Sequence, residues 1–143
     1  MFSAQELENI PVHTLIPQRE PIVMISRVTA YSGKQIRTEL DIDEENIFLG
    51  KNGFSESGML ENIAQTAAAI VGLEALSAGK EVPLGFIGGI TKVKVYELAP
   101  ALCTVHTQVE ILHEIFNITL IKGKQFHLEN LLLECEMKIV INP

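Results

Sequence analysis

The segment of residues 57–78 is filled mainly by alanine and aliphatic side chains and carries no charge between Glu61 and Glu74. Alanine has the highest intrinsic helix propensity, so this composition predicts one long helix. A helix that is apolar on all its sides belongs in the core of a protein rather than on its surface. Because the segment also holds Glu61, Asn62, Gln65 and Glu74, we do not expect it to span a membrane.

Glu61 lies near the start of the predicted helix, and Gln65 follows four residues later on the same face. Burial among apolar side chains disfavours the charged form of a carboxyl group, which makes such a group a usable general acid or base near neutral pH. Glu61 and Gln65 are therefore candidate catalytic residues. The alternative, which the sequence leaves open, is that Glu61 only stabilises the helix N-terminus through its dipole and capping hydrogen bonds.

The chain of 143 residues is 47% hydrophobic and 20% charged, which favours a single domain over residues 1–143 with a sizeable core. Its net charge of −7 argues against a nucleic-acid partner. Residues 1–8 lack the positive region and the apolar run of a signal peptide, so we expect a cytoplasmic protein. The cysteines, Cys103 and Cys135, and the four histidines show no metal-ligand spacing. We therefore expect reduced cysteines, no metal and no other cofactor.

The part of the chain before the helix predicts a pair of strands followed by a loop. An apolar run begins at Ile22, and we expect one strand over residues 22–30 and a second over residues 35–43. The sequence Ser-Gly-Lys at residues 32–34 predicts the turn between them. Residues 44–54 are broken by two glycines and predict a loop.

Beyond residues 79–83 the hydrophobic period changes from about 3.6 to about 2, which is typical of half-buried strands. One such alternation starts at Cys103, and another occupies residues 131–141. The sequence Lys122-Gly123-Lys124 predicts a hairpin turn, and the whole region predicts about four strands in a meander. A single apolar helix with this many strands must be covered by the sheet. The expected fold class is α+β, with an antiparallel sheet wrapped around one long buried helix.

Three segments are similar to motifs that occur together in one known family. Residues 16–28, with the sequence Ile-Pro-Gln-Arg-Glu-Pro-Ile-Val-Met-Ile-Ser-Arg-Val, resemble a Leu-Pro-His-Arg-x-Pro-aliphatic run closed by Asp-Arg-Val. Residues 61–65 resemble a Glu-x-x-Ala-Gln helix motif, and residues 85–95 match a following strand more loosely. Together they resemble the hotdog-fold 3-hydroxyacyl-acyl-carrier-protein dehydratase family. The chain looks closest to the divergent dehydratase-like proteins associated with aryl-polyene and flexirubin pigment synthesis.

The resemblance implies a catalytic pair shared across a dimer interface. In the family, a helix glutamate and a histidine from a Gly-His-Phe-Pro loop remove the α-proton and assist departure of the 3-hydroxyl. Glu61 matches the glutamate, whereas the corresponding loop here, residues 48–56, contains no histidine. Gln18 and Ser26 stand where the family's opening motif has histidine and aspartate. None of the chain's own histidines has a catalytic assignment.

Two further parts of a thioester site are expected around the helix. Unpaired backbone N–H groups near Gly58 and Met59 would polarise a thioester carbonyl, and Gly58 would let a ligand approach the backbone closely. Ile63 and Phe86 are expected to line a pocket for an acyl chain. The alternatives are a flexible glycine at the helix start and ordinary core packing of the apolar side chains.

The expected carrier of the acyl thioester is an acyl carrier protein or coenzyme A. Carrier proteins are acidic as a class, and this chain is acidic too, so docking requires a local basic patch. Lys92 and Lys94 lie two residues apart, on one face of a predicted strand, and are candidate docking residues. The alternative is that they form only a solvated face.

The expected function is that of a 3-hydroxyacyl-acyl-carrier-protein dehydratase-like protein, which acts on or binds acyl thioesters as a homodimer or as a heterodimer with another hotdog subunit. One alternative is a catalytically incomplete subunit whose Glu61 completes a site with the histidine of an intact partner. A second is an acyl-thioesterase in which the helix carboxylate activates water or attacks the carbonyl. A third is an acyl-thioester binding module without catalytic activity.

Overall fold

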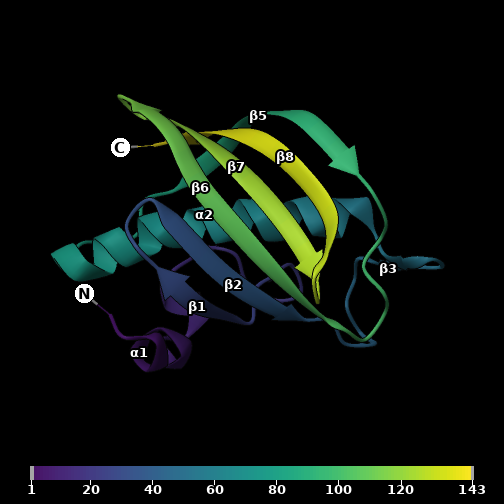
Figure 1. Ribbon diagram of the computed structural model, residues 1–143. Coiled ribbons are helices and arrows are strands. Elements are labelled where there is room, and N and C mark those ends of the chain that lie inside the picture. Colours follow the sequence, from purple (N-terminus) through teal and green to yellow (C-terminus); the bar gives the residue numbers. More distant parts are fainter. Residues whose placement is uncertain (1, 143) are drawn as a thin grey trace.

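The computed structural model describes residues 2–142, in which a curved antiparallel sheet wraps around the long helix α2 (Glu56–Ala78) (Figure 1). The other helices are α1 (Ala4–Asn9) and the short 3-10 helix η1 (Val12–Thr14). The strands are β1 (Arg27–Tyr31), β2 (Gln35–Asp41), β3 (Leu49–Gly50), β4 (Gly53–Phe54), β5 (Gly85–Val95), β6 (Thr104–Ile115), β7 (Ile118–His127) and β8 (Asn130–Ile141). This arrangement is the hotdog fold and confirms the predicted α+β class.

Helix α2 begins and ends at residues suited to those positions. Ser55 occupies the N-cap position, and its Oγ accepts a hydrogen bond from the backbone N–H of Gly58 at 3.3 Å. Gly79 ends the helix in the left-handed conformation, at φ +66°, which glycine adopts without a side-chain clash. Most residues from 58 to 75 are buried, so the predicted long buried helix is confirmed. No helix within residues 2–142 is long and apolar enough to cross a membrane.

The inner face of the sheet packs on α2 through the side chains that alternate in the sequence. In β6 the inward-facing residues include Val105 and Val109, and in β8 they include Cys135 and Met137. Each of these four side chains is at most 2% exposed. The period-2 pattern predicted for both strands is therefore confirmed.

The hairpin turn predicted at residues 122–124 is wrong, because these residues lie in the middle of β7. Gly123 stands opposite Cys135 of β8, where α2 packs tightly against the sheet. A Cβ atom on Gly123 would lie 2.3 Å from Cγ2 of Ile63 in α2. The glycine thus permits close packing of the helix on the strand rather than a turn. The β6–β7 turn instead includes Phe116, which is fully exposed.

Strand β5 pairs with β8 rather than with β6, so the predicted meander holds only for β6, β7 and β8. The order of the six long strands is β1-β2-β6-β7-β8-β5, which places β1 and β5 at opposite edges of the sheet. Figure 1 shows β5 arching over α2 on the side away from α1. Within residues 2–142, β5 therefore has a hydrogen-bonded neighbour on one side only.

The apolar run after Pro21 does not form a strand, contrary to the prediction, and β1 begins only at Arg27. The backbone N–H of Met24 donates to Oε1 of Gln65 at 2.6 Å, and its carbonyl accepts from Nδ2 of Asn62 at 2.7 Å. Side chains of α2 thus satisfy the backbone groups that a neighbouring strand would otherwise satisfy. The loop before β1 is consequently fixed to the central helix.

Candidate active site

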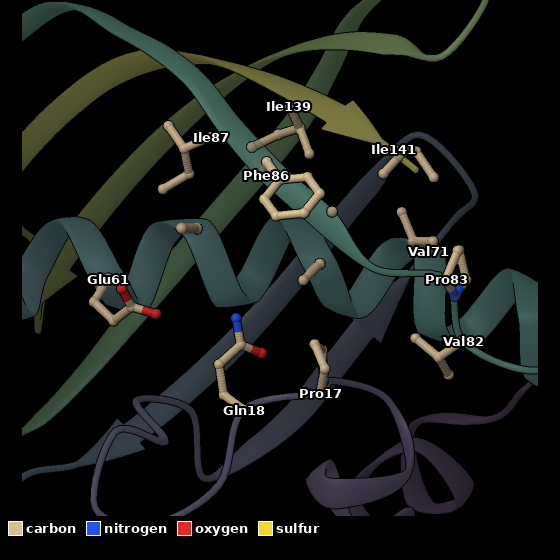
Figure 2. Close-up of a pocket in the computed structure, with 13 residues that line it drawn as sticks. Pro17, Gln18, Glu61, Val71, Val82, Pro83, Phe86, Ile87, Ile139 and Ile141 are labelled. Atoms are coloured by element: carbon tan, nitrogen blue, oxygen red, sulfur yellow. The ribbon is translucent and has the colours of Figure 1, made fainter. Parts of the chain in front are cut away.

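A cavity of about 270 Å³ opens beside α2, between β5, β8 and the loop that precedes β1 (Figure 2). Among the described residues that line it, Glu61 carries the only charge and Gln18 the only other polar side chain. Such a mostly apolar wall with few polar groups is typical of small-molecule sites. The rest of the wall consists of Pro17, Ala64, Ala68, Val71, Val82, Pro83, Gly85, Phe86, Ile87, Ile139 and Ile141.

Gln65 is fully buried and holds Glu61 from one helical turn away. Its Nε2 donates hydrogen bonds of 2.8 Å to Oε2 of Glu61 and to the carbonyl of Ile22. Its Oε1 accepts from the backbone N–H of Met24 at 2.6 Å, which fixes the orientation of the amide. One carboxylate oxygen of Glu61 is therefore held in place. The other makes no side-chain hydrogen bond within residues 2–142.

Glu61 itself is partly buried, at the cavity wall, although most of the helix around it is buried. A carboxyl group in this position is accessible both to a ligand in the cavity and to proton exchange with water. The catalytic roles of Glu61 and Gln65 stay predictions.

A buried polar network that the sequence analysis missed lies next to Glu61 along α2. Asn62 is fully buried, and its Oδ1 accepts hydrogen bonds from Oγ1 of Thr107 at 2.5 Å and from Nε2 of Gln125 at 2.6 Å. Its Nδ2 donates to the carbonyl of Met24. Because buried polar groups are costly without partners, this network fixes α2 both to the sheet and to the loop before β1. The sequence signal for this network was Asn62, an amide side chain within an otherwise apolar predicted helix.

The backbone N–H groups of Gly58 and Met59 are not unpaired, contrary to the expectation for a thioester-binding role. Gly58 donates to Oγ of Ser55 at 3.3 Å, and Met59 donates to the carbonyl of Ser55 at 3.0 Å. Gly58 is buried, and a Cβ atom there would lie 2.5 Å from Cβ of Phe48 and 2.6 Å from Cε1 of Phe54. Its lack of a side chain therefore permits packing of the two aromatic residues.

Of the two residues predicted for an acyl pocket, only Phe86 lies at the cavity. Ile63 is completely buried and packs against Gly123 on the sheet side of α2. The side chain of Phe86 is 55% exposed, and Figure 2 shows its ring between β5 and α2. The cavity wall is thus built mainly by residues of α2, β8 and the α2–β5 connection that the sequence analysis did not single out.

The four histidines of the chain lie outside the cavity wall. His13 pairs with Glu20 in the loop region before β1. Nδ1 of His106 lies 3.1 Å from Oε2 of Glu39, on the outer face of the sheet. Within residues 2–142, no histidine therefore stands beside the cavity carboxylate.

The two lysines predicted to dock a carrier protein lie on β5 among carboxylates. A β-bulge between Thr91 and Lys94 interrupts the regular alternation on which the prediction depended. Nζ of Lys92 lies 3.3 Å from Oε2 of Glu136, and Lys94 stands opposite Glu134. The two lysines therefore do not form a purely basic patch.

Burial raises the pKa of several groups away from the cavity carboxylate. Partial burial and the nearby charge of Glu114 raise the pKa of Glu74, near the C-terminal end of α2. Burial, together with both of these carboxylates, raises the pKa of Tyr31. Burial also raises the pKa of the Cys135 thiol to about 11 and raises that of Cys103, and neither cysteine forms a disulfide. Both thiols are thus protonated at neutral pH.

Gln18 is a candidate that sequence reasoning noted only as a departure from the family's motif. It lies in the loop before β1, and its side chain forms part of the cavity wall (Figure 2). Its Oε1 is shielded from solvent and has no hydrogen-bond partner in the described part of the chain. The tertiary structure thus brings this amide to the same cavity as Glu61.

Comparisons with known proteins agree with this architecture. Residues 10–126 match a family model described as ApeP-like, the ApeP dehydratase. Among curated proteins, none matches the sequence. A solved structure titled the dehydratase heterocomplex ApeI:P from Xenorhabdus doucetiae is similar with a TM-score of 0.82 and 16% identity, over 94% of this chain and 92% of that chain.

Two further solved structures share the fold with lower TM-scores. A hypothetical thioesterase from Streptococcus pneumoniae TIGR4, solved with coenzyme A, has a TM-score of 0.65 and 8% identity, over 80% of this chain and 84% of that chain. The PaaI protein of the E. coli phenylacetic acid degradation operon has a TM-score of 0.64 and 8% identity, over 79% and 80% of the two chains. At these identities the likeness is one of fold.

Proposed function

The chain belongs to the ApeP-like dehydratase family, and on this basis we propose that it is a subunit of a dehydratase that acts on 3-hydroxyacyl thioesters. The observation that carries the proposal is the carboxylate of Glu61 at the wall of an apolar cavity, with one oxygen held by Gln65. A carboxyl group in a fixed orientation beside such a cavity is suited to proton transfer on a bound acyl chain.

Dehydration involves two proton transfers, and in this proposal two separate groups carry them out. The reaction removes a proton from C2, breaks the C3–O bond and forms the C2=C3 double bond, while the hydroxyl takes up a proton and leaves as water. Glu61 supplies one of the two groups. The described part of the cavity wall contains no second titratable side chain, which supports a proposal in which another subunit supplies the other group.

In this proposal the second group is a histidine of another hotdog subunit that docks at β5. This edge strand exposes Phe86, Ile87, Ile90, Val93 and Val95, each between 37% and 55%. An edge with free backbone groups and exposed apolar side chains is a template for pairing with a further strand. Because β5 also lines the cavity, a partner docked there would stand beside Glu61. The similarity to a dehydratase solved as a heterocomplex supports this arrangement.

The acyl group is carried, in this proposal, by coenzyme A or by an acyl carrier protein. The apolar wall of the cavity suits an acyl chain, and one distant structural neighbour was solved with coenzyme A. We propose Lys92 and Lys94 as the docking site of a carrier protein. The carboxylate of Glu136 pairs with Lys92 and would weaken the attraction of an acidic carrier to this lysine.

Hydration of a 2-enoyl thioester, the reverse reaction, tests the proposal through loss of the conjugated enoyl absorbance. The chain is assayed alone and after co-expression with a hotdog dehydratase that retains the loop histidine. We expect turnover only in the complex, and a loss of at least about 100-fold on Glu61→Gln. The matched control is Glu56→Gln, in the first turn of the same helix but outside the cavity wall, which should retain the rate.

Three outcomes would count against the proposal. Full turnover by the Glu61→Gln complex would remove the role of the carboxylate. Full turnover by the isolated chain would remove the need for a partner histidine, as would a complex whose partner histidine can be replaced by alanine without loss. Release of free thiol in place of hydration would indicate the thioesterase alternative.

A further inference from the structure

A second, smaller cavity of about 20 Å³ lies between α2 and the strands β6, β7 and β8. Three residues line both this small cavity and the main cavity beside Glu61, namely Val71, Ile139 and Ile141. The rest of the small cavity's wall consists of Ala67, Ile70, Glu74, Ile111, Glu114, Thr119 and Ile121. The two cavities are thus neighbours that meet at three aliphatic side chains.

The geometry of α2 places Val71 at the boundary between the two cavities. Successive residues of an α-helix are rotated by about 100° around its axis. The residues of α2 that line the main cavity but not the small one therefore share one side, namely Glu61, Ala64 and Ala68. Those that line the small cavity but not the main one share the adjacent side, namely Ala67, Ile70 and Glu74. Val71 lies between these two sides.

Val71 stands at the end of the main cavity that is remote from Glu61. The two residues are ten positions apart in the sequence, which corresponds to about 15 Å along the helix axis. Figure 2 shows Glu61 at one end of the cavity, with Val71 and Ile141 at the other. If the reacting carbons of a substrate lie at the carboxylate, the tail of its acyl chain extends along the apolar wall toward Val71.

The small cavity beyond this boundary does not suit an apolar chain. Glu74 and Glu114 line it, and both are exposed to solvent. A carboxylate loses hydration when an apolar group packs against it, which is unfavourable. A chain longer than the main cavity would thus meet first the three shared aliphatic side chains and then two carboxylates.

We infer that Val71 is a specificity-determining residue, which with Ile139 and Ile141 limits the length of the acyl chain by closing the main cavity. The inference rests on the proposed function, and it narrows the substrate class to chains whose tail ends before this boundary. Val71 is partly exposed, whereas Ile139 is only 8% exposed. The valine side chain is therefore the more accessible of the two to a ligand in the cavity.

The test measures affinity as a function of chain length. The ligands are non-reacting pantetheine amides that carry saturated acyl groups of increasing length, and calorimetry measures their binding to the complex with its histidine-bearing partner. Each methylene that is buried in the cavity should raise the affinity about 4-fold. Once the tail reaches the boundary, a further methylene should give no gain. The chain length at which the gain stops is the limit that the experiment determines.

Two substitutions of Val71 should move this limit in opposite directions. Val71→Ala widens the boundary and should shift the limit to longer chains, whereas Val71→Phe narrows it and should shift the limit to shorter ones. The matched control is Val82→Ala, since Val82 lines the main cavity but not the small one. This control should weaken binding of chains that contact Val82 and leave the limit where it is.

A further variant separates the boundary from general loosening of the core. Ile111 lines the small cavity but not the main one, so Ile111→Ala alone should leave the limit unchanged. Combined with Val71→Ala, it should shift the limit further than Val71→Ala does alone. The limit is determined within one ligand series on one variant, so modest destabilisation of that variant does not affect it.

The outcomes distinguish this inference from the proposed function. Overturning the role of Val71 while leaving the proposed function standing takes one of three results: a limit that neither substitution of Val71 moves, a limit that Val82→Ala moves equally, or affinities that do not depend on chain length. A wild-type complex that binds no member of the series would overturn the proposed function and the inference with it.

Discussion

Gln65 joins Glu61 to the loop before β1 through a single amide group. The same nitrogen donates to the carboxylate of Glu61 and to the carbonyl of Ile22, while the oxygen accepts from the N–H of Met24. The orientation of the cavity carboxylate and the position of the loop that carries Gln18 are thus fixed by one buried side chain. Stability and activity should therefore change together when this side chain is altered.

Replacing Gln65 by leucine should lower both the free energy of unfolding and the rate. The substitution leaves the buried N–H of Met24 and the partly buried carbonyl of Ile22 without their partner, which should cost about 2–4 kcal/mol. Urea unfolding measures this loss, and enoyl hydration by the complex should fall in parallel. Gln65→Glu keeps an acceptor for Met24 but no donor for Glu61. A rate for Gln65→Glu equal to that of the wild type would contradict a positioning role.

Replacing Gly123 by alanine should destabilise the protein by about 1–3 kcal/mol, because the new Cβ would lie 2.3 Å from Cγ2 of Ile63. The matched control is Gly89→Ala in β5, where a Cβ would meet nothing within 4 Å and the change should be near zero. A double-mutant cycle with Ile63→Ala should show a favourable coupling energy, since the second change removes the clashing atom. Equal unfolding free energies for the two glycine variants would show that the helix can move away from β7.

Replacing Ile90 by lysine should weaken assembly while the isolated chain stays folded. Ile90 lies on the β5 edge with 37% of its surface exposed, and a charge there opposes burial against a partner strand. We expect the dissociation constant of the complex to rise by at least about 10-fold, measured by sedimentation, because a desolvated unpaired charge is unfavourable. The control is Leu128→Lys in the β7–β8 turn. Leu128 is 72% exposed, and its replacement should leave assembly unchanged. Unaltered assembly of the Ile90 variant would place the interface elsewhere.

Replacing Glu74 by glutamine should change how stability depends on pH. Burial and Glu114 raise the pKa of Glu74 above its ordinary value of 4.5, so the folded chain holds this proton more tightly than the unfolded chain does. The contribution of Glu74 to the free energy of unfolding therefore falls as the pH rises above 4.5, and Glu74→Gln removes that decrease. The variant should match the wild type near pH 4 and exceed it at pH 7 in urea unfolding.

Glu114→Gln is the companion variant for this prediction. It removes the repelling charge and should act in the same direction, because the pKa of Glu74 then returns toward its ordinary value. Parallel pH profiles for wild type and both variants would contradict the assigned interaction.

Patterns that repeat over many residues were predictable. The apolar run of α2 and the alternation in β6 and β8 reflect local preferences that recur along each element, and the structure confirms them. Single-residue signals were less reliable. The Lys-Gly-Lys sequence around Gly123 is typical of a turn, yet the glycine lies within a strand and makes room for Ile63, which is distant in the sequence.

The loop before β1 shows a similar limit. Its apolar residues match a strand, but their backbone hydrogen bonds go to Asn62 and Gln65 of α2. A strand and an extended loop held by side chains can have the same local composition. They differ in the groups that accept and donate their backbone hydrogen bonds, and these groups are distant in the sequence. The pairing of β5 with β8 likewise depends on strands that are remote in the chain.

The sequence by itself determined the long helix, the alternation of β6 and β8, the family motifs and the i, i+4 relationship that brings Glu61 and Gln65 together. The tertiary structure decided which side of that helix faces the sheet and which side faces the cavity. Ile63 packs against the sheet, whereas Glu61 and Ala64 line the cavity together with Gln18. The physical reason is that a helix apolar on all sides has no polar face to set its rotation. Its orientation is fixed by long-range packing against Gly123 and by the buried hydrogen bonds of Asn62, which no local pattern contains.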